Sequence, residues 1–147
     1  MQMTAHPTAY TAASPAVYAR SLNRPRAGRI LSWLAVLFLL FDSAGKLLQV
    51  QPVIDGTIQL GYPRDVVFPL GVILLSCVIV YVIPRTSVLG AVLLTGYLGG
   101  AIATHVRVEN PLFTHVLFPT YVAAFVWGGL VLREERVRAL LPIRREP

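Results

Sequence analysis

Hydrophobic positions along the chain gather into four long stretches separated by short polar segments. The stretches cover about residues 30–50, 66–83, 87–106 and 116–132. A helix needs about 20 mostly apolar residues to cross the roughly 30 Å hydrocarbon core of a bilayer, and each stretch is close to that length. The pattern predicts an all-α integral membrane protein, an antiparallel four-helix bundle whose spans are joined by short connections.

The remaining segments complete the predicted domain organisation. Residues 1–28 are rich in alanine, threonine, serine and proline and hold no apolar run, so we expect a disordered basic tail. Residues 29–132 form the four-span membrane domain, and residues 133–147 form a short, basic, amphipathic segment. Between the first two spans, Pro52 and Gly61 are typical of the beginning and end of a short helix, which would lie in the membrane interface.

The distribution of charged residues along the chain is best explained by the orientation of the protein in the membrane. Only 14% of the residues are charged, against about 25% in soluble domains. Nine of the 13 lysines and arginines lie before the first span or after the last, which by the positive-inside rule places the N- and C-termini in the cytoplasm. The same basic ends would attract anionic membrane lipid. No aromatic stacking platform accompanies them, so nucleic-acid binding is not expected.

Two ionisable residues lie inside the first span. A charged side chain in the middle of a bilayer costs about 2.5–3.5 kcal/mol on insertion scales, so it needs a partner or water. Asp42 and Lys46 are four residues apart with the acid first, which is the favourable order for an ion pair on one helix face. They form either a self-neutralising pair, with Lys46 reaching toward the interface, or part of the wall of a polar pocket.

Further polar residues also fall in the outer half of the bundle when positions are counted at about 1.5 Å per residue. The third span runs in the same direction as the first, so Thr104 and His105 lie near its outer boundary, and His115 enters the fourth span from that side. We therefore predict a ligand-binding pocket in the outer half of the bundle. Its candidate residues are Asp42, Lys46, Tyr97, Thr104, His105 and Arg107. The alternative for His105 is an interfacial histidine bonded to a carbonyl group or to lipid.

Small residues predict where helices pack closely. Gly96 and Gly100 form a GxxxG pair in the third span, and Gly128 and Gly129 suggest a similar role in the fourth. We expect the GxxxG pair to pack within the chain, with a dimer interface or close approach of a ligand as the alternatives. No metal site is expected, because no two potential ligands share a helix face at metal-binding spacing.

Several runs of residues, taken in order, resemble the DoxX-like family of small four-helix membrane proteins. They are DSAGKL at 42–47, LGYP at 60–63, IPRT at 83–86, TGYLGGAIATHVRV at 95–108, NPLF at 110–113 and LFP at 117–119. The resemblance covers about residues 30–138. It implies a multi-pass protein of the inner membrane, mostly bacterial, without one general biochemical activity. Relatives include a subunit of a thiosulfate:quinone oxidoreductase, so a quinone is the cofactor that the resemblance suggests.

Two functions follow from these features, and whether the chain is an enzyme stays open. The favoured one is an accessory or structural membrane subunit, whose glycine face and basic C-terminal segment bind a protein partner or a second copy of the chain. The alternative is a quinone- or lipophile-binding subunit that supports membrane redox chemistry. In it, Asp42 and His105 would handle protons, while Lys46 and Arg107 would hold an anionic or carbonyl group. Direct thiol–disulfide chemistry is not expected, because Cys77 is the single cysteine.

Overall fold

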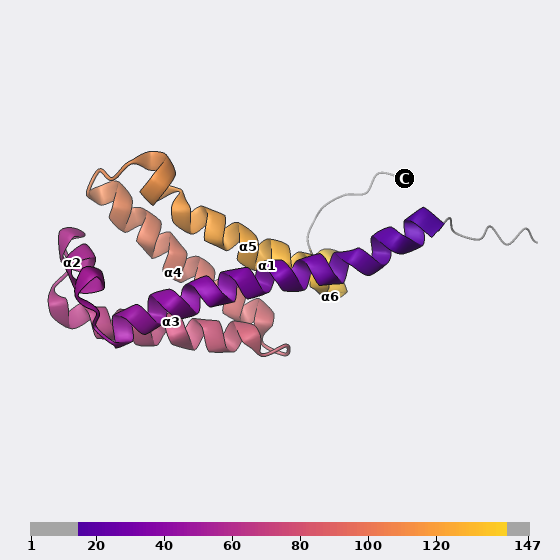
Figure 1. The fold of residues 1–147 in the computed structure, drawn as a ribbon, viewed down its shortest axis with the longest axis horizontal. Coiled ribbons are helices and arrows are strands. Elements are labelled where there is room, and N and C mark those ends of the chain that lie inside the picture. Colours follow the sequence, from indigo (N-terminus) through magenta and orange to yellow (C-terminus); the bar gives the residue numbers. More distant parts are fainter. Residues whose placement is uncertain (1–14, 141–147) are drawn as a thin grey trace, which may run out of the picture.

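A computed structural model describes residues 15–140, all of them in helices or in the turns that connect helices (Figure 1). The elements are α1 (Pro15–Leu47), α2 (Gln51–Gln59), the 3₁₀ turn η1 (Arg64–Val66), α3 (Val67–Val82), α4 (Ser87–Arg107), the π-helical turn η2 (Leu112–Val116), α5 (Phe118–Arg133) and α6 (Glu135–Leu140). Four segments are long and apolar enough to cross a membrane, namely Pro25–Leu47, Arg64–Val82, Ser87–Arg107 and Leu112–Arg133. The prediction of an all-α protein with four spans is confirmed.

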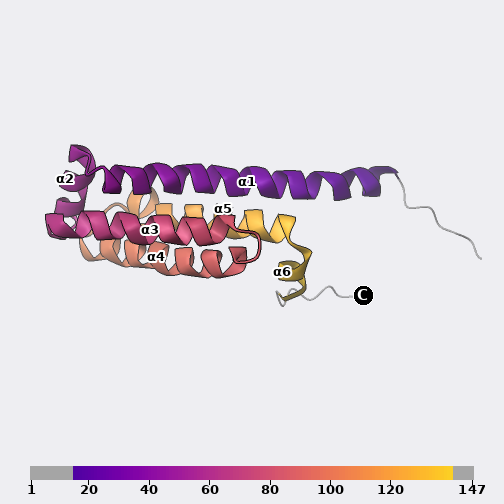
Figure 2. The same ribbon diagram turned by 90° about the horizontal axis from the view of Figure 1, so that it is seen from below.

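The four long helices form an antiparallel bundle. Helix α1 packs against α3 and α5, and α4 packs against the same two helices from the other side. Figure 2 shows this order, with α1 on one side, α3 and α5 in the middle and α4 on the far side. The end that carries α2, η1 and η2 is called the loop end below. The opposite end, with Arg26, Arg29, Arg133, Arg136 and Arg138, is called the arginine end.

Several boundaries differ from those that hydropathy predicts. Helix α1 begins at Pro15, so residues 15–28 of the predicted disordered tail are helical, while residues 1–14 lie outside the described part. Extending an existing helix avoids the cost of nucleation, and Gly28 packs this part of α1 against α5. The C-terminal segment is helical over α6, and residues 141–147 lie outside the described part.

The first connection contains the predicted short helix. Helix α2 has Pro52 in its first turn, and Gly61 follows its end with a φ of +83°, in the left-handed region that favours glycine. The connection between the third and fourth spans is shorter than predicted, because the fourth span already begins at Leu112. His115 therefore belongs to the helical segment rather than to a loop.

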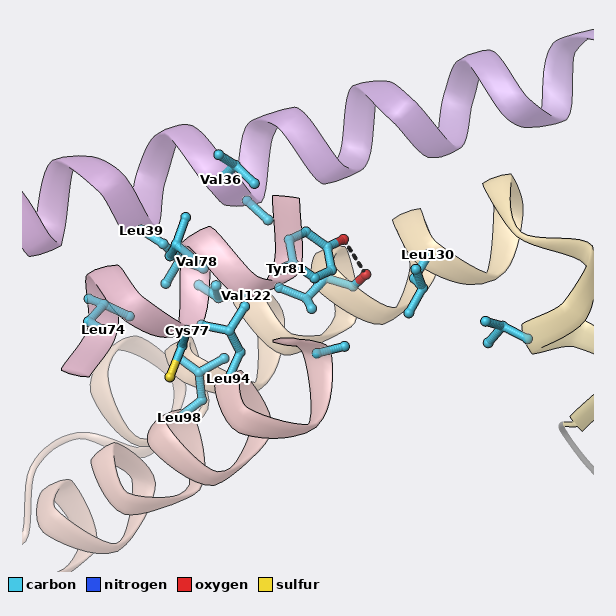
Figure 3. Packing of buried hydrophobic residues seen from close by; sticks show 14 residues of the cluster. Val36, Leu39, Leu74, Cys77, Val78, Tyr81, Leu94, Leu98, Val122 and Leu130 are labelled. Carbon is cyan, nitrogen blue, oxygen red and sulfur yellow. Dashed lines mark hydrogen bonds between the residues drawn. The ribbon is translucent and has the colours of Figure 1, made fainter. Parts of the chain in front are cut away.

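The core of the bundle is apolar and narrow. Leu74, Leu94 and Leu130 are fully buried, and Tyr81 is the largest of the fully buried side chains (Figure 3). About a third of each span is buried inside the bundle, and the outward side chains are mostly apolar, as Leu37 and Phe41 illustrate. An exposed apolar surface of this extent is suited to contact with lipid.

Three glycines bring helix backbones into direct contact. A Cβ atom at Gly28 would lie 2.9 Å from the carbonyl oxygen of Gly129, and one at Gly129 would lie 2.8 Å from the backbone nitrogen of Ser32. A Cβ atom at Gly90 would overlap the backbone of Tyr81. The expectation for Gly129 is thus met. Helices α1 and α5, and likewise α3 and α4, approach at distances that only glycine allows.

The GxxxG pair does not pack in this way. A Cβ atom at Gly96 or Gly100 would meet nothing within 4 Å. The expected close packing of these two glycines within the chain is therefore wrong for the described bundle, because α4 is rotated so that its close contact with α3 lies at Gly90. Gly96 and Gly100 instead line a cavity.

Candidate functional site

A cavity of about 660 Å³ lies at the loop end of the bundle. Its volume is within the range of about 300–1,000 Å³ typical of small-molecule sites. In the view of Figure 1, α4 and α5 diverge from α1 and α3 toward this end, where α2 lies across the bundle. The lining residues come from α1, α2, α3, α4, η2 and α5 together with the connections at this end.

Five of the six residues predicted for the pocket line this cavity. They are Asp42, Lys46, Tyr97, Thr104 and His105. Residues from two separate helices thus converge on one space, as their depths along the spans indicate. The polar side chains of His115, Asn110, Tyr62 and Thr57 line it as well. Of these, Tyr62 and Asn110 lie in the family-like runs at 60–63 and 110–113, which is the signal that could have identified them.

Arg107 does not line the cavity but closes the loop end beside it. Its Nη2 donates a hydrogen bond of 2.7 Å to the carbonyl oxygen of Leu60, and its guanidinium lies 5.9 Å from the centroid of the Tyr62 ring. Arg107 thus ties the end of α4 to the connection between α2 and α3. Its contacts are those of a residue that positions the wall of the cavity.

Asp42 and Lys46 form an ion pair along one turn of α1. The Lys46 Nζ donates to the Asp42 Oδ1, and the side chains are 13% (Lys46) and 33% (Asp42) exposed. Both interpretations from the sequence therefore describe the same pair, which is self-neutralising and also lines the cavity. The pairing of the two charges lowers the cost of holding them within a span. The pair still presents a carboxylate and an ammonium group to a ligand.

Thr104 links α4 to the connection between α2 and α3. Its Oγ1 donates to the carbonyl oxygen of Gly100 at 2.9 Å and lies 2.9 Å from the Tyr62 hydroxyl. A hydroxyl carries one hydrogen, so the Tyr62 hydroxyl is the donor to Thr104. The phenol ring of Tyr62 is thereby fixed against the cavity wall.

Two histidines face each other at the cavity. The rings of His105 and His115 meet edge to face, with 5.7 Å between centroids. The Asn110 Nδ2 amide lies 2.8 Å from the His105 Nδ1. Because an amide NH₂ only donates, Nδ1 accepts this bond and the ring hydrogen is carried by Nε2. The His115 Nδ1 bonds to the Thr114 hydroxyl at 2.8 Å. An imidazole pair of this kind can both donate and accept hydrogen bonds.

The rest of the cavity wall is apolar. Phe38, Leu39, Leu70, Phe118 and Val122 belong to it. An apolar wall with polar groups at one end suits an amphipathic molecule. Within residues 15–140, no group of three or more histidine, cysteine, aspartate or glutamate residues could hold a metal ion. Cys77 lies in the apolar core and does not line the cavity.

These features define a small four-span membrane protein with an amphipathic cavity between its helices. The chain belongs to the DoxX-like family, whose model matches residues 30–129. The matched region contains every residue that lines the cavity and ends before α6. No curated protein and no solved structure showed a significant match to the chain.

Proposed function

We propose that the protein binds a lipophilic small molecule with a polar head, of which a quinone is the model case, and serves as the lipophile-binding subunit of a membrane redox system. The observation that carries the proposal is the cavity of about 660 Å³, in which the ion pair, the two histidines and Tyr97 meet an apolar wall. Ligand sites in proteins commonly combine a mainly apolar lining with a few polar groups that fix orientation.

The polar groups suit the carbonyl or hydroxyl oxygens of such a head. Lys46 and the Nε2–H of His105 can donate to a carbonyl oxygen, and the Tyr97 hydroxyl has no hydrogen-bond partner among the described residues. Asp42 and the imidazoles can accept a hydroxyl hydrogen. A quinone that is reduced to a quinol takes up two electrons and two protons. Carboxyl and imidazole groups are suited to deliver the protons.

The proposed setting is the bacterial inner membrane, with both termini in the cytoplasm. Arginines from α1, from the turn between α3 and α4, and from α5 and α6 gather at the arginine end, whereas Arg64 and Arg107 lie near the loop end. By the positive-inside rule, this distribution supports an orientation in which the cavity lies in the outer half of the bilayer. Single cysteines introduced at exposed positions of α2 should react with an impermeant maleimide from outside the cell, and labelling from the cytoplasmic side would contradict this orientation.

The binding proposal is tested by analysis of co-purified small molecules. The protein is purified in mild detergent, and lipophiles released on denaturation are identified by mass spectrometry. We expect one lipophile per chain in the wild type and loss of most of it in Asp42→Asn and in His105→Ala. Asp55→Asn is the matched control, because Asp55 is exposed on α2, bonds to Gln51 and does not line the cavity.

Two results would contradict the proposal. One is a wild-type protein that carries bulk phospholipid alone. The other is an equal lipophile content in the wild type, Asp42→Asn and His105→Ala.

An accessory role is the second candidate, and the open glycine face of α4 favours it. A Cβ atom at Gly99 would meet nothing within 4 Å, and Gly99 is exposed and does not line the cavity. A helix from a partner or from a second copy could pack there. Gly99→Leu should then dissociate a complex that is stable in mild detergent while the cavity ligand is retained. An unchanged complex in this variant would remove the candidate.

A further inference from the structure

A second, smaller cavity lies at the arginine end, away from the proposed lipophile site. Its volume is about 70 Å³, and Ser32, Trp33, Val36, Tyr81, Val82 and Arg133 line it. The residues belong to α1, α3 and α5. The space is too small for the body of a lipid or a cofactor, and its size suits a single polar group.

Arg133, which lines this cavity, carries unpaired donors. Its Nε and Nη2 atoms are shielded from solvent and have no hydrogen-bond partner within the described residues. On a guanidinium, Nε–H and Nη2–H lie along the same edge, which is the fork that binds carboxylate or phosphate with two parallel bonds. Burying charged donors without a partner is costly, so the arrangement indicates an anionic ligand.

The neighbouring side chains do not supply that anion. Within residues 15–140, no carboxylate lies within ion-pair distance of Arg133, and Glu135 pairs with Arg138 at 3.4 Å instead. The Tyr81 hydroxyl donates to the carbonyl oxygen of Val126 at 2.9 Å (Figure 3) and lies 3.0 Å from the Ser32 hydroxyl, which therefore donates to it. The polar floor of the cavity is thus satisfied without Arg133.

Tyr81 also fixes the place of the guanidinium. The Arg133 Cζ lies 5.2 Å from the centroid of the buried Tyr81 ring, which is within the range of a cation–π contact. Helix α5 ends at Arg133, where the helix dipole favours a positive charge. The guanidinium is therefore placed beside the Tyr81 ring, and because its Nε and Nη2 atoms are covered, the side chains around them must shift for a phosphate to reach them.

The surroundings favour lipid phosphate as the source of the anion. Arg26, Arg29 and Arg136 are exposed at the same end, where anionic headgroups would gather. Trp33 and Val82 line the cavity and are also exposed to the surroundings of the bundle. Tryptophan is enriched at the headgroup level of membranes, and an apolar rim of this kind can receive the first carbons of acyl chains.

We propose that Arg133 binds the phosphate group of an anionic phospholipid in the leaflet at the arginine end. The phosphate accepts two hydrogen bonds from the Nε and Nη2 atoms of Arg133 beside the Tyr81 ring. The acyl chains extend past Trp33 and Val82 along the outside of the bundle. The site is independent of the lipophile cavity at the loop end, and its occupant would fasten α1, α3 and α5 together where they leave the membrane.

Native mass spectrometry of the full chain in mild detergent tests the proposal. The protein is titrated with phosphatidylglycerol and, separately, with diacylglycerol of the same acyl chains, which lacks the phosphate. We expect one retained phosphatidylglycerol and no retained diacylglycerol. Arg133→Gln should weaken phosphatidylglycerol binding by about tenfold, because a charge-assisted pair of hydrogen bonds is lost. The affinity of Arg133→Lys for phosphatidylglycerol should lie between those of the wild type and Arg133→Gln, because lysine keeps the charge but lacks the pair of parallel donors.

Arg136→Gln is the matched control, since it removes the same charge from an exposed position of the same end. Its affinity should stay within about twofold of the wild type, because exposed charges contribute little. Phosphatidylglycerol should raise the melting temperature of the wild type and of Arg136→Gln, and leave that of Arg133→Gln unchanged.

Three results would overturn the proposal. The first is equal loss of lipid in Arg133→Gln and Arg136→Gln, which would indicate general attraction by the basic end. The second is retention of diacylglycerol as well as phosphatidylglycerol. The third is displacement of the lipid by inorganic phosphate at equal concentration, which would assign the site to a soluble anion. If Arg133→Gln does not fold, an unchanged affinity of Arg133→Lys would be the contradicting result.

Discussion

Replacing Gly90 by alanine perturbs the closest approach of α3 and α4. A Cβ atom at this position would lie 2.7 Å from the Cβ atom of Tyr81 and would overlap the backbone nitrogen and Cα of the same residue. Carbon atoms at optimal contact are about 3.5–4.0 Å apart, so the two helices must separate by about 1 Å or more.

Tyr81 cannot absorb this displacement alone. Its hydroxyl is tied to Val126 of α5 and to Ser32 of α1, so a shift of α3 also disturbs the contacts of two other helices. Overpacking of a well-packed core costs about 1–3 kcal/mol, and the better helix propensity of alanine returns up to about 1 kcal/mol. We therefore expect Gly90→Ala to lower the free energy of unfolding by about 2 kcal/mol.

The assay is equilibrium unfolding in mixed micelles of mild detergent and dodecyl sulfate, followed by circular dichroism. Gly96→Ala is the matched control, because it makes the same chemical change on the same helix at a position with nothing within 4 Å. We expect this variant to be as stable as the wild type or slightly more stable. Equal stability of Gly90→Ala and Gly96→Ala would refute the described contact between α3 and α4.

Further substitutions test three individual contacts. Arg107→Ala removes the bond from α4 to the carbonyl of the α2–α3 connection, so hydrogen exchange in residues 48–66 should rise while global stability falls by about 1 kcal/mol; unchanged exchange would contradict this contact. Tyr81→Phe leaves a buried carbonyl group without its donor and should cost about 1–3 kcal/mol, whereas Tyr97→Phe, with no hydrogen-bond partner among the described residues, should cost little. Lys46→Met should lower the free energy of unfolding by about 1–2 kcal/mol, which is less than the loss expected for a fully buried ion pair, because a third of the Asp42 side chain is exposed. The double variant with Asp42→Leu should recover most of this loss. Strict additivity of the two single effects would show that the pair is not coupled.

The spans could be predicted from the sequence because a membrane imposes one length on every apolar helix. The third span was predicted at 87–106, and α4 covers Ser87–Arg107. Hydropathy marks where a helix enters lipid rather than where it begins, so it gave no sign that α1 starts at Pro15. The fourth span begins earlier than predicted because the π-helical turn at Leu112–Val116 continues the helix through polar residues.

The grouping of the site residues could be predicted from depth alone. A helix rises by a fixed distance per residue, so Asp42 and His105 could be placed in the same half of the bundle although they are far apart in the chain. The contact made by Arg107 could not be predicted, because helix periodicity does not determine where a long side chain at the end of a helix points. It bonds to the backbone of the α2–α3 connection rather than lining the cavity.

The role of Gly129 was predicted, but the roles of the other glycines could not be, because they depend on how each helix is rotated about its axis. The spacing of Gly96 and Gly100 matches a packing motif, yet both positions open onto a cavity. Gly28 and Gly90 belong to no such motif and make backbone contacts with α5 and α3. Rotation is set by the whole set of side chains that meet in the core, which no local pattern reports.

Filling the cavity from Gly100 would test the proposed function most directly. A leucine at this position would extend from a residue that lines the cavity, and nothing lies within 4 Å of its Cβ position. Gly99→Leu places the same side chain on the outside of α4 and serves as the control. The quantity to measure is the amount of lipophile extracted per folded chain from the wild type and from each variant. We predict one molecule in the wild type and in Gly99→Leu and almost none in Gly100→Leu, whereas an equal amount in all three proteins would contradict binding in this cavity.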